Sequence, residues 1–517
     1  GSRKKAIKTA INELESNEIL LVAGKGHEET QDYGNKIINF SDKNVIKEII
    51  KKRKFFSKKR CWTEEIARKV FKNSNLKNAN YDGVSINTKT IKKNNLFFAI
   101  RGKNTDGHKF AKEAIEKGAI KSVISKKINQ LSNNKIIKVK STFSSLNNLA
   151  KVTRNNSCAQ IIGITGSVGK TTLKNLISFA LTNYGKVYHS PHSYNNKFGV
   201  PLSLSNLKSN TEYGIFEIGM SKKGEIDNLS KIVKPEIAII TNISEAHFEN
   251  FNTLKDIAKA KAEIIDNILE NGNIILNKDD KFFTFLSDKA RKKGINVISF
   301  SSKQKADIFL LNIRKIRNHY RLKIDIKNKI FYFDSIYSTN NFINNILACI
   351  SALSVLNLDL NNVKKKFMNF VIPNGRGDIK IVKKFKKRFK FIDESYNANP
   401  LSMTSAIKNM NYYERKNNVQ KLVLLGDMLE LGKKSKKLHR ALSTTINKSD
   451  IDKVFVYGKH IRETFKFLST NKKGKVFNNL KEAYDHFSEI LHNNDLLMVK
   501  GSNATGLNQF SQNIKKG

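Results

Sequence analysis

The glycine-rich segment from Gly163 to Thr172 has the residue types that bind nucleotide phosphates. It follows an apolar, strand-like run and precedes apolar residues at helical spacing. Glycines let backbone N–H groups turn toward phosphate, and the start of a helix adds partial positive charge. Lys170 would reach the β and γ phosphates, and the Thr171 hydroxyl would contact magnesium. The segment predicts an ATP and Mg²⁺ site, although its first glycine precedes Gly169 by six positions, one more than in the strict motif.

Side chains able to bind a metal or phosphate follow the next strand-like runs. Glu217 ends one run, and His247 comes shortly after the run Ile237 to Ile240. A buried carboxylate is costly unless it binds a cation or a partner, and doubly wound sheets bind ligands at the carboxyl ends of their strands. Lys261 falls in a predicted helix, Leu254 to Ile265. From these residues alone, His247 is more often a structural histidine than a ligand, and Lys261 is normally a surface lysine.

Composition limits the class of protein. A chain of 517 residues is long enough for about three domains. The formal charge of +49 is spread through every predicted element, so it indicates a bias toward Lys, Asn and Ile, or a field attracting polyanionic substrates. The three cysteines are far apart, which suits a reducing compartment. Without a long apolar run or a signal-peptide pattern, we expect a soluble, cytoplasmic protein.

The order of the predicted elements indicates several α/β units. Expected strands and helices alternate from Cys158 to about Asn369, which predicts a parallel sheet built from βαβ units. In the first unit we expect a helix at Arg3 to Leu14 and a strand at Ile19 to Ala23. Pro373 to Gly375 marks a plausible hinge. The expected domain bounds are 1–55, 56–156, 157–370 and 371–517.

Three motifs occur in the order found in the Mur ligases, and the chain therefore resembles that family. They are Thr165 to Thr171, Glu217 with Gly224 to Ile226, and Thr241 to His247. Further segments resemble the branch that joins D-Ala-D-Ala to UDP-N-acetylmuramoyl-tripeptide. These are Tyr194 to Pro201, Asp393 to Pro400, and Gly426 to Gly432 with His439 downstream. Together the motifs span about residues 60 to 510.

The resemblance implies an α/β fold of three domains: a domain for the UDP substrate, a central P-loop ATPase domain with a parallel sheet, and a C-terminal Rossmann-like domain. It implies an ATP-dependent amide ligase of peptidoglycan synthesis, serving cell-wall biogenesis, cell shape and division. The reaction would pass through an acyl phosphate and release ADP and phosphate. ATP and Mg²⁺ would be needed, nucleic acid and membrane insertion are not expected, and other cell-wall enzymes are possible partners.

The resemblance also implies roles for individual residues. The ATP loop would comprise Gly166, Ser167, Val168, Gly169, Lys170, Thr171 and Thr172, with further nucleotide contacts from Asn341, Arg376 and Asp393. The metal would be held by Thr171, Glu217, His247 and a carbamylated Lys261, and catalysis would depend on Lys170, Lys261, His247 and Glu217. The UDP end would bind Ser85, Lys89, Asp106 and His108, and the dipeptide side Tyr396, Asn397 and Asn399.

The chain departs from the family pattern at several positions. Lys89 stands where the family usually has an arginine near the uridine. The point charge of an ammonium therefore replaces the bidentate hydrogen bonding of a guanidinium. Asn341 lies in an altered segment but still offers an amide to adenine, and Asn503 replaces an arginine. Residues 1 to 55 resemble the C-terminal end of the Mur ligases that add the third stem-peptide residue. That segment is either a channelling relic or, more simply, a silent remnant, because half a site cannot assemble a reaction centre.

Three other functions stay open at this point. One is another amide ligase of the superfamily, such as a folylpolyglutamate synthase, which differs in its acceptor. Another is a basic P-loop NTPase acting with nucleic acid, whose hydrolysis would fall steeply with salt. The segment Asn397 to Pro400 argues against both. The last is an inactive fusion product that scaffolds cell-wall enzymes.

Overall fold

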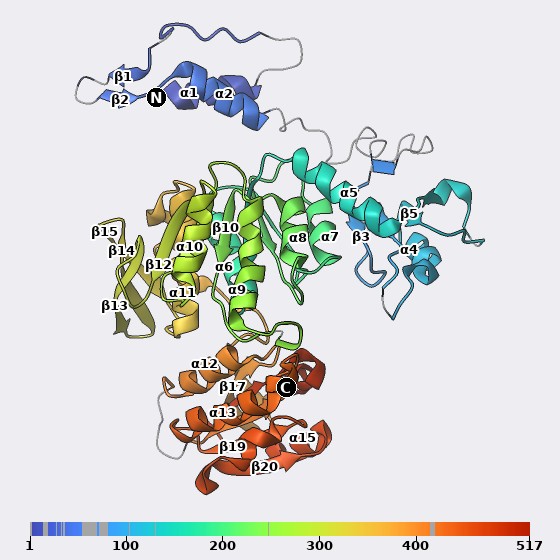
Figure 1. The fold of residues 1–517 in the computed structure, drawn as a ribbon, viewed down its shortest axis with the longest axis vertical. Coiled ribbons are helices and arrows are strands. Elements are labelled where there is room, and N and C mark those ends of the chain that lie inside the picture. Colours follow the sequence, from blue (N-terminus) through green and yellow to red (C-terminus); the bar gives the residue numbers. More distant parts are fainter. Residues whose placement is uncertain are drawn as a thin grey trace. The chain divides into compact units, whose positions relative to one another are not determined.

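The computed structural model describes residues 3–13, 19–26, 28–32, 34, 37–53, 70–71, 81–102, 104–129, 131–246, 248–413 and 419–516 (Figure 1). The chain divides into two compact units. One comprises Gly1–Gln160, Gly185–Tyr188 and Pro201–Gly214, and the other comprises Ile161–Tyr184, His189–Val200 and Ile215–Gly517. Among the described residues, none of the helices combines the length and apolar character that crossing a membrane requires.

The first unit begins with two helices and a hairpin. They are α1 (Arg3–Glu13), β1 (Thr30–Asp32), β2 (Ile37–Asn39) and α2 (Asp42–Arg53), with β1 and β2 antiparallel. Helix α1 confirms the first predicted helix. Its apolar face shares a small core with α2, formed by Ile7, Ile11, Phe40, Val45 and Ile49. The Arg3 guanidinium binds the Asp42 carboxylate, with Nε 2.8 Å from Oδ1, and so joins the starts of both helices.

The predicted strand at Ile19 to Ala23 is wrong. These residues are described, and they form no strand. Ile19 is 96% exposed and Leu21 is 85% exposed. An apolar run becomes a strand only where a neighbouring strand accepts its backbone hydrogen bonds. The hairpin of this unit forms later in the chain, and its two strands pair with each other.

The first unit also contains a four-stranded parallel sheet. Its order is β3 (Gly83–Ser85), β4 (Asn95–Phe98), β5 (Lys121–Ile124) and β6 (Ile136–Lys138). The associated helices are η2 (Gly107–Phe110), α4 (Ala111–Glu116) and α5 (Thr142–Asn155). Strand β4 is buried on both faces, which explains its run of apolar residues. Helix α5 begins where the Ser141 hydroxyl accepts the Ser144 N–H.

A nine-stranded sheet forms the centre of the chain. Its strands in chain order are β7 (Gln160–Thr165), β8 (Val187–His189), β9 (Tyr213–Glu217), β10 (Ile237–Ile240), β11 (Asn273–Asn277), β12 (Asn296–Ser301), β13 (Ile308–Ile316), β14 (His319–Ile326) and β15 (Lys329–Ser335). Their order in the sheet is β15-β14-β13-β12-β11-β10-β7-β9-β8. Strand β10 runs parallel to β7 and β11, so the carboxyl ends of these strands meet at one edge.

The central sheet contains the predicted parallel strands, but it is antiparallel at one side. Strands β13, β14 and β15 form an antiparallel meander. Strand β14 ends at Ile326 and β15 begins at Lys329, so only Lys327 and Asn328 connect them. Both have left-handed backbone angles, φ 51° and 67°. Such a tight connection reverses the chain, whereas a parallel neighbour needs a long crossover.

The central helices position the ends of the strands. They are α6 (Lys170–Leu181), α7 (Gly199–Ser205), α8 (Glu225–Val233), α9 (Leu254–Lys261), α10 (Phe283–Lys292) and α11 (Asn340–Val355). Helix α11 is almost wholly buried and packs on α6 and on β11 to β13. Helix α9 starts at a capping box of Thr253 and Asp256. Its predicted span is too long, because the chain tightens into a 3₁₀ helix at Ala262–Asn267.

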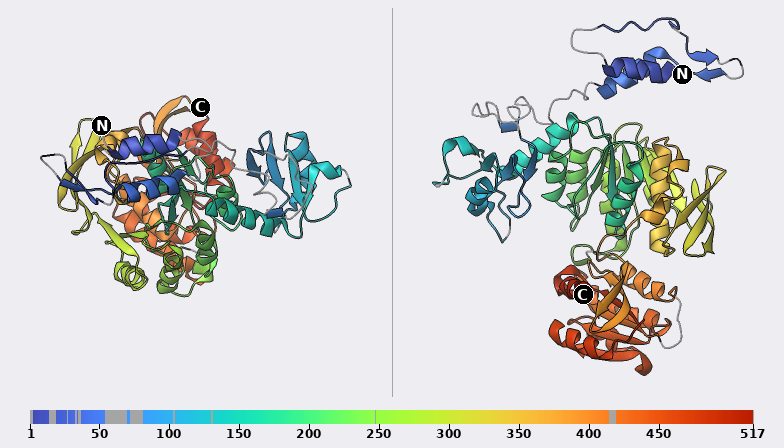
Figure 2. Two further views of the ribbon diagram at one scale, coloured as in Figure 1. Left: turned by 90° about the horizontal axis from the view of Figure 1, so that it is seen from above. Right: turned by 180° about the vertical axis from the view of Figure 1, so that it is seen from behind.

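The last part of the chain, coloured orange to red in Figure 2, contains a six-stranded sheet. Its strand order is β16-β17-β21-β18-β19-β20. The strands are β16 (Asp378–Lys384), β17 (Lys387–Glu394), β18 (Lys421–Gly426), β19 (Lys453–Tyr457), β20 (Lys473–Phe477) and β21 (Leu496–Lys500). Its helices are α12 (Pro400–Met410), α13 (Ser435–Asn447), α14 (Arg462–Lys466), α15 (Leu480–Ile490) and α16 (Leu507–Lys515). Strand β16 is antiparallel to β17, and the other pairs are parallel.

Alternating residues of β18 explain why helices cover both faces of this sheet. Val423 and Leu425 belong to the core that contains residues of α12 and α13. Leu422 and Leu424 belong to the core that contains residues of α15 and α16. Successive side chains of a strand point to opposite faces, so four consecutive apolar residues require a cover on each side. The four strands predicted for this region, which correspond to β17, β18, β19 and β21, are confirmed.

Candidate functional site

Gly166 and Gly169 shape the phosphate loop between β7 and α6. Their φ angles are 143° and 90°, which residues with side chains rarely adopt. A Cβ on Gly166 would also lie 1.9 Å from the Thr241 hydroxyl oxygen. Gly169 is the N-cap of α6, so the loop ends at unpaired helix N–H groups. The local structure therefore has the strand, loop and helix that the sequence predicts.

The carboxyl end of β10 holds this loop in place. The Thr241 hydroxyl donates to the Val168 carbonyl at 2.6 Å, and the Val168 N–H donates to Asn242 Oδ1 at 3.0 Å. The Ser167 hydroxyl donates to the Ser244 carbonyl at 3.1 Å and accepts the Ser244 N–H at 2.9 Å. Two segments about 75 residues apart thus fix the shape of the loop together, because β7 and β10 are neighbours.

A buried carboxylate and several cations lie beside the loop. Glu217 is 1% exposed and accepts the Thr171 hydroxyl at 2.6 Å and the Asn195 amide at 2.8 Å. Burial alone would raise the pKa of Glu217, but the charges of Lys170, Arg376 and Lys174 and the Thr171 hydrogen bond together lower it. Glu217 is therefore anionic at neutral pH, although it is buried.

Lys170 is the first residue of α6. Its Nζ donates to the Gly166 carbonyl at 2.7 Å, so its side chain folds back over the loop. Burial lowers the pKa of Lys170, and the negative charge of Glu217 opposes that shift. A cation over a glycine-rich loop beside free helix N–H groups is suited to bind phosphate.

A cavity of about 540 Å³ brings many of the predicted site residues together. The site residues that line it are Ser167, Val168, Gly169, Lys170, Thr172, Glu217, Asn341, Arg376, Tyr396, Asn397 and Asn399. The Arg376 guanidinium stacks over the Tyr396 ring at 4.1 Å and donates to the Ser193 hydroxyl at 3.0 Å. His247 lies outside the described residues. Among those that are described, no three His, Cys, Asp or Glu side chains cluster to hold a metal ion.

Asp393 has internal partners in this structure and is not among the residues that line the cavity. Its Oδ1 accepts the Ser395 N–H at 3.0 Å, and its Oδ2 pairs with Lys515 Nζ at 2.6 Å. Lys515 also binds Asp378, whose other oxygen accepts the N–H of Gly375 at 2.7 Å. The next residue, Glu394, does line the cavity, since successive side chains of a strand alternate in direction.

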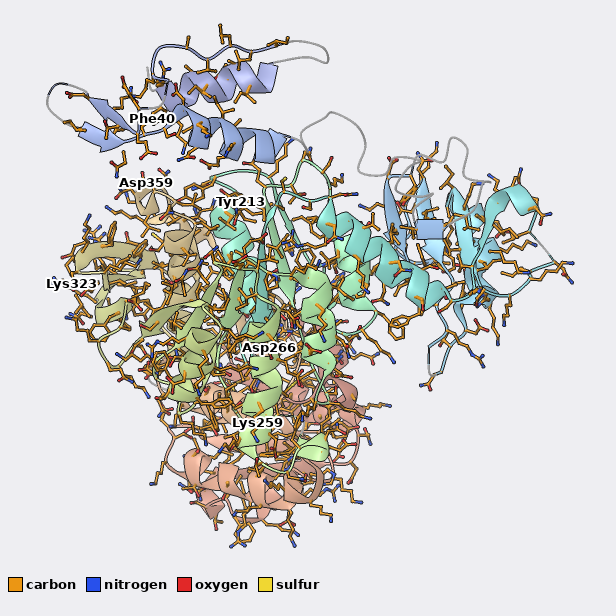
Figure 3. All side chains as sticks on the ribbon, turned by 45° about the horizontal axis from the view of Figure 1, so that its top comes forward. Phe40, Tyr213, Lys259, Asp266, Lys323 and Asp359 are labelled. Atoms are coloured by element: carbon orange, nitrogen blue, oxygen red, sulfur yellow. The ribbon has the colours of Figure 1, made fainter. Side chains whose placement is uncertain are left out.

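Lys261 is buried at the end of α9, with 2% of its surface exposed. Burial, followed by the charge of Lys170, sets the pKa of Lys261 well below its ordinary value. Lys259, two residues earlier, is exposed (Figure 3). The alternative that Lys261 is a surface lysine is therefore wrong. A buried amine with a lowered pKa is more often neutral, and a neutral amine is nucleophilic.

The four residues predicted for the UDP end lie in the first unit. The buried His108 accepts the Ser125 N–H at Nε2 (3.0 Å), so its Nδ1 carries the proton and donates to Asp106 Oδ1 at 2.6 Å. The Lys126 ammonium and then the His108 N–H hold the pKa of Asp106 below its usual range. Ser85 is buried at the end of β3, and Lys89 is exposed. Asp106 and His108 thus have a structural role in this unit.

We expect Asp106→Ala to destabilise the first unit by about 1–3 kcal/mol, because it leaves the buried His108 N–H without an acceptor. Thermal unfolding followed by circular dichroism measures this. Asp82→Ala is a matched control, since Asp82 is exposed and accepts one amide N–H at 3.2 Å. Equal melting temperatures for both variants would show that the Asp106 pair contributes nothing to folding.

Several residues of the site were given no role in the sequence analysis, although Asn195 lies within the motif from Tyr194 to Pro201. Ser193 and Asn195 line the cavity and contact Arg376 and Glu217, respectively. Lys500, at the end of β21, also lines it and pairs with Glu394 at 3.0 Å. The signal that could have found Lys500 is its position at the carboxyl end of a predicted parallel strand. For Ser193 no local pattern exists, because the residue follows a strand of only three residues.

Comparisons with known proteins agree with this geometry. Residues 80–157 match the model of the Mur ligase family catalytic domain, residues 164–353 that of the Mur ligase middle domain, and residues 379–503 that of the Mur ligase glutamate ligase domain. A Rickettsia prowazekii protein named UDP-N-acetylmuramoyl-tripeptide--D-alanyl-D-alanine ligase is 33% identical over 432 residues, 83% of this chain and 94% of that protein.

Solved structures show the same fold. A crystal structure of MurF from Acinetobacter baumannii matches with a TM-score of 0.76 and 22% identity, covering 89% of this chain and 99% of the other. MurF ligase from Thermotoga maritima in complex with ADP matches with a TM-score of 0.71 and 24% identity, covering 85% and 99%.

Proposed function

The chain belongs to the Mur ligase family, and from that premise we propose that it joins D-Ala-D-Ala to UDP-N-acetylmuramoyl-tripeptide. It is an ATP-dependent ligase of peptidoglycan synthesis with the three-domain α/β Mur ligase fold, as the sequence predicts. The observation that supports the proposed substrates is the cavity, which joins the phosphate loop to Arg376, Tyr396 and Asn397.

The proposed reaction has two steps. The tripeptide carboxylate attacks the γ phosphate of ATP, forming an acyl phosphate and ADP. The amine of D-Ala-D-Ala then attacks the acyl carbon, loses a proton, and displaces phosphate as the amide bond forms. Catalysis of this kind depends on positioning and on neutralising charge, so no Ser or Cys nucleophile is needed. The loop N–H groups, Lys170 and Arg376 supply the donors that such a reaction requires.

The residues beside Lys170 fit a magnesium ion. Mg²⁺ prefers oxygen ligands and is usually bound by one or two protein oxygens together with substrate phosphates. The Thr171 hydroxyl and the anionic Glu217 carboxylate are 2.6 Å apart beside the loop and supply such oxygens. When bound, the ion would neutralise charge on the phosphates. We propose these two residues as ligands, together with His247 and a carbamylated Lys261.

The remaining site assignments are also proposals. We assign Asn341 to adenine, and Tyr396, Asn397 and Asn399 to the dipeptide side, since all four line the cavity. We propose that Asp393 contacts the nucleotide, which requires that its ion pair with Lys515 be broken. Ser85, Lys89, Asp106 and His108 remain our candidates for the UDP end. The four domain bounds and the cytoplasmic location also remain proposals.

We propose that residues 1–55 are catalytically silent. The Arg3 guanidinium donates to Asp42 and to the Ala23 carbonyl, each at 2.8 Å. These hydrogen bonds hold the segment together internally. Asp42 is 6% exposed, and removing its cation would leave a buried charge without a partner.

The test is ADP release with Mg²⁺, UDP-N-acetylmuramoyl-tripeptide and D-Ala-D-Ala, omitting each in turn, with the product identified by mass. We expect turnover only when all are present, and a UDP-linked pentapeptide as the product. Omission of Mg²⁺ tests the metal proposal. Turnover without either peptide substrate that rises with nucleic acid and falls with salt would contradict the proposal and favour a nucleic-acid-dependent NTPase.

A further inference from the structure

Lys174 is a buried lysine that the reaction proposed above does not use. It lies on α6, one turn after Lys170, with none of its surface exposed. Its Nζ donates to the Ser190 carbonyl at 2.6 Å and to the His192 carbonyl. Burial lowers the pKa of Lys174 to about 8, and the negative charge of Glu217 opposes the shift. The side chain is therefore mostly a cation at neutral pH, with two main-chain carbonyls as its partners.

The carbonyls that bind Lys174 belong to a segment, residues 190–195, that we name the strap. Ser190 is fixed to the central sheet, because its N–H donates to the Ile215 carbonyl at 3.0 Å and its hydroxyl accepts the Glu217 N–H at 3.3 Å. His192 has a φ of 44°, a left-handed conformation that residues with side chains adopt only when their surroundings hold them. The hydrogen bond from the Lys174 ammonium to the His192 carbonyl can hold His192 in this conformation.

The far end of the strap contacts three residues of the proposed site. The Ser193 hydroxyl lies 3.3 Å from the Thr171 hydroxyl and accepts a hydrogen bond from Arg376 at 3.0 Å. The Asn195 amide donates to Glu217 at 2.8 Å, and its carbonyl accepts the Gly219 N–H at 2.8 Å. The strap therefore contacts the proposed metal-binding hydroxyl of Thr171, the buried carboxylate of Glu217 and the guanidinium of Arg376.

We propose that Lys174 is a positioning residue, whose ammonium fixes the strap so that Ser193 and Asn195 hold Thr171, Glu217 and Arg376 in their reactive arrangement. Binding two carbonyls of one tight turn needs several donors on a flexible stem, which lysine has. Its charge also stabilises the anionic Glu217 nearby. An apolar side chain of similar length would fill the space but would leave both carbonyls without this donor.

The inference rests on the proposed function for its kinetic test, so the experiment also includes a measurement that needs no turnover. Lys174→Met is compared with Lys421→Met. Lys421 is 1% exposed, donates to the Met410 carbonyl at 2.7 Å and also pairs with Asp450, but it does not line the cavity. Each substitution removes a buried ammonium that donates to a main-chain carbonyl. Only Lys174 is adjacent to the strap. Hydrogen exchange of residues 189–196 is then followed by mass spectrometry.

We expect faster exchange in the strap by about tenfold in Lys174→Met and unchanged exchange there in Lys421→Met. The kcat for ligation should fall about tenfold to a hundredfold in Lys174→Met, with ATP binding within about threefold of the wild type. Lys174→Gln, which keeps two donors, should retain more activity than Lys174→Met, and it serves as the test variant if Lys174→Met does not fold.

Coupling separates positioning from general destabilisation. If Lys174 acts through the strap, adding Asn195→Ala to Lys174→Met should lower kcat far less than Asn195→Ala does alone. Unchanged strap exchange in the folded Lys174 variants, multiplicative losses in the double variant, or an equal kcat loss in Lys421→Met would each overturn the inference. If the wild-type protein catalyses no ligation, the proposed function is contradicted. Hydrogen exchange in the strap would still decide the role of Lys174.

Discussion

Replacement of Lys170 by alanine is expected to lower ligase kcat by about a hundredfold to a thousandfold with the fold intact. The Lys170 Nζ lies over the phosphate loop, 2.7 Å from the Gly166 carbonyl, and Lys170 lines the cavity. Its charge also lowers the pKa of Glu217. The variant should therefore lose both a phosphate donor and part of the stabilisation of the buried carboxylate. ADP release under saturating substrates measures the effect.

Lys366→Ala is a suitable control for this variant. Lys366 also contacts α6, but at its far end, where its Nζ binds the Thr182 hydroxyl at 2.8 Å. It does not line the cavity, and its hydrogen bond to Thr182 is at the exposed surface. We expect wild-type turnover from Lys366→Ala. Wild-type turnover from Lys170→Ala would contradict the assignment of the loop to ATP.

Lys261→Ala should also reduce kcat about a hundredfold or more, if the lysine is a carbamate that binds metal. A neutral amine adds to CO₂ to give a carbamate anion and a released proton, and burial favours the neutral amine by lowering the pKa of Lys261. Because the pKa is lowered, the neutral fraction appears as pH rises through that value and is lost below it. At a fixed concentration of dissolved CO₂, the activity of enzyme freed of CO₂ should accordingly recover faster as the pH rises through that value.

Lys259→Ala is the matched control, since Lys259 is exposed on the same helix two residues earlier. It should leave turnover unchanged. A carbon-13 NMR spectrum in labelled bicarbonate should show a carbamate signal in the wild type and in Lys259→Ala that is absent from Lys261→Ala. Full activity in Lys261→Ala would exclude an essential metal-binding role for this side chain.

Features formed by neighbouring residues could be predicted from the sequence, because the interactions that determine them lie within one short stretch of chain. The phosphate loop needs glycines, a preceding strand and a following helix, and all three lie within 23 residues of chain, from Ala159 to Leu181. Strands β17, β18, β19 and β21 could be predicted because a run of apolar residues in an α/β protein must be buried on both faces. Helix α1 likewise follows from its own apolar spacing.

The features that could not be predicted depend on distant partners. Asp393 binds Lys515, which is 122 residues later in the chain, and no local pattern links them. Lys261 and Lys259 have the same side chain on one helix, and only packing decides which is buried. The strand predicted at Ile19 to Ala23 failed for the same reason, since apolar residues alone do not supply a pairing neighbour.

The double contact of Lys515 has a practical consequence for work with this protein. Helix α16 ends at Lys515, whose ammonium joins Asp378 and Asp393 beneath the turn that carries Arg376. Helix α16 thus braces a turn that begins about 140 residues earlier and was predicted to be a hinge. Removing the helix would leave two buried carboxylates without their shared cation. Shortened versions intended for crystallisation should therefore keep α16, and an affinity tag after it needs a flexible spacer.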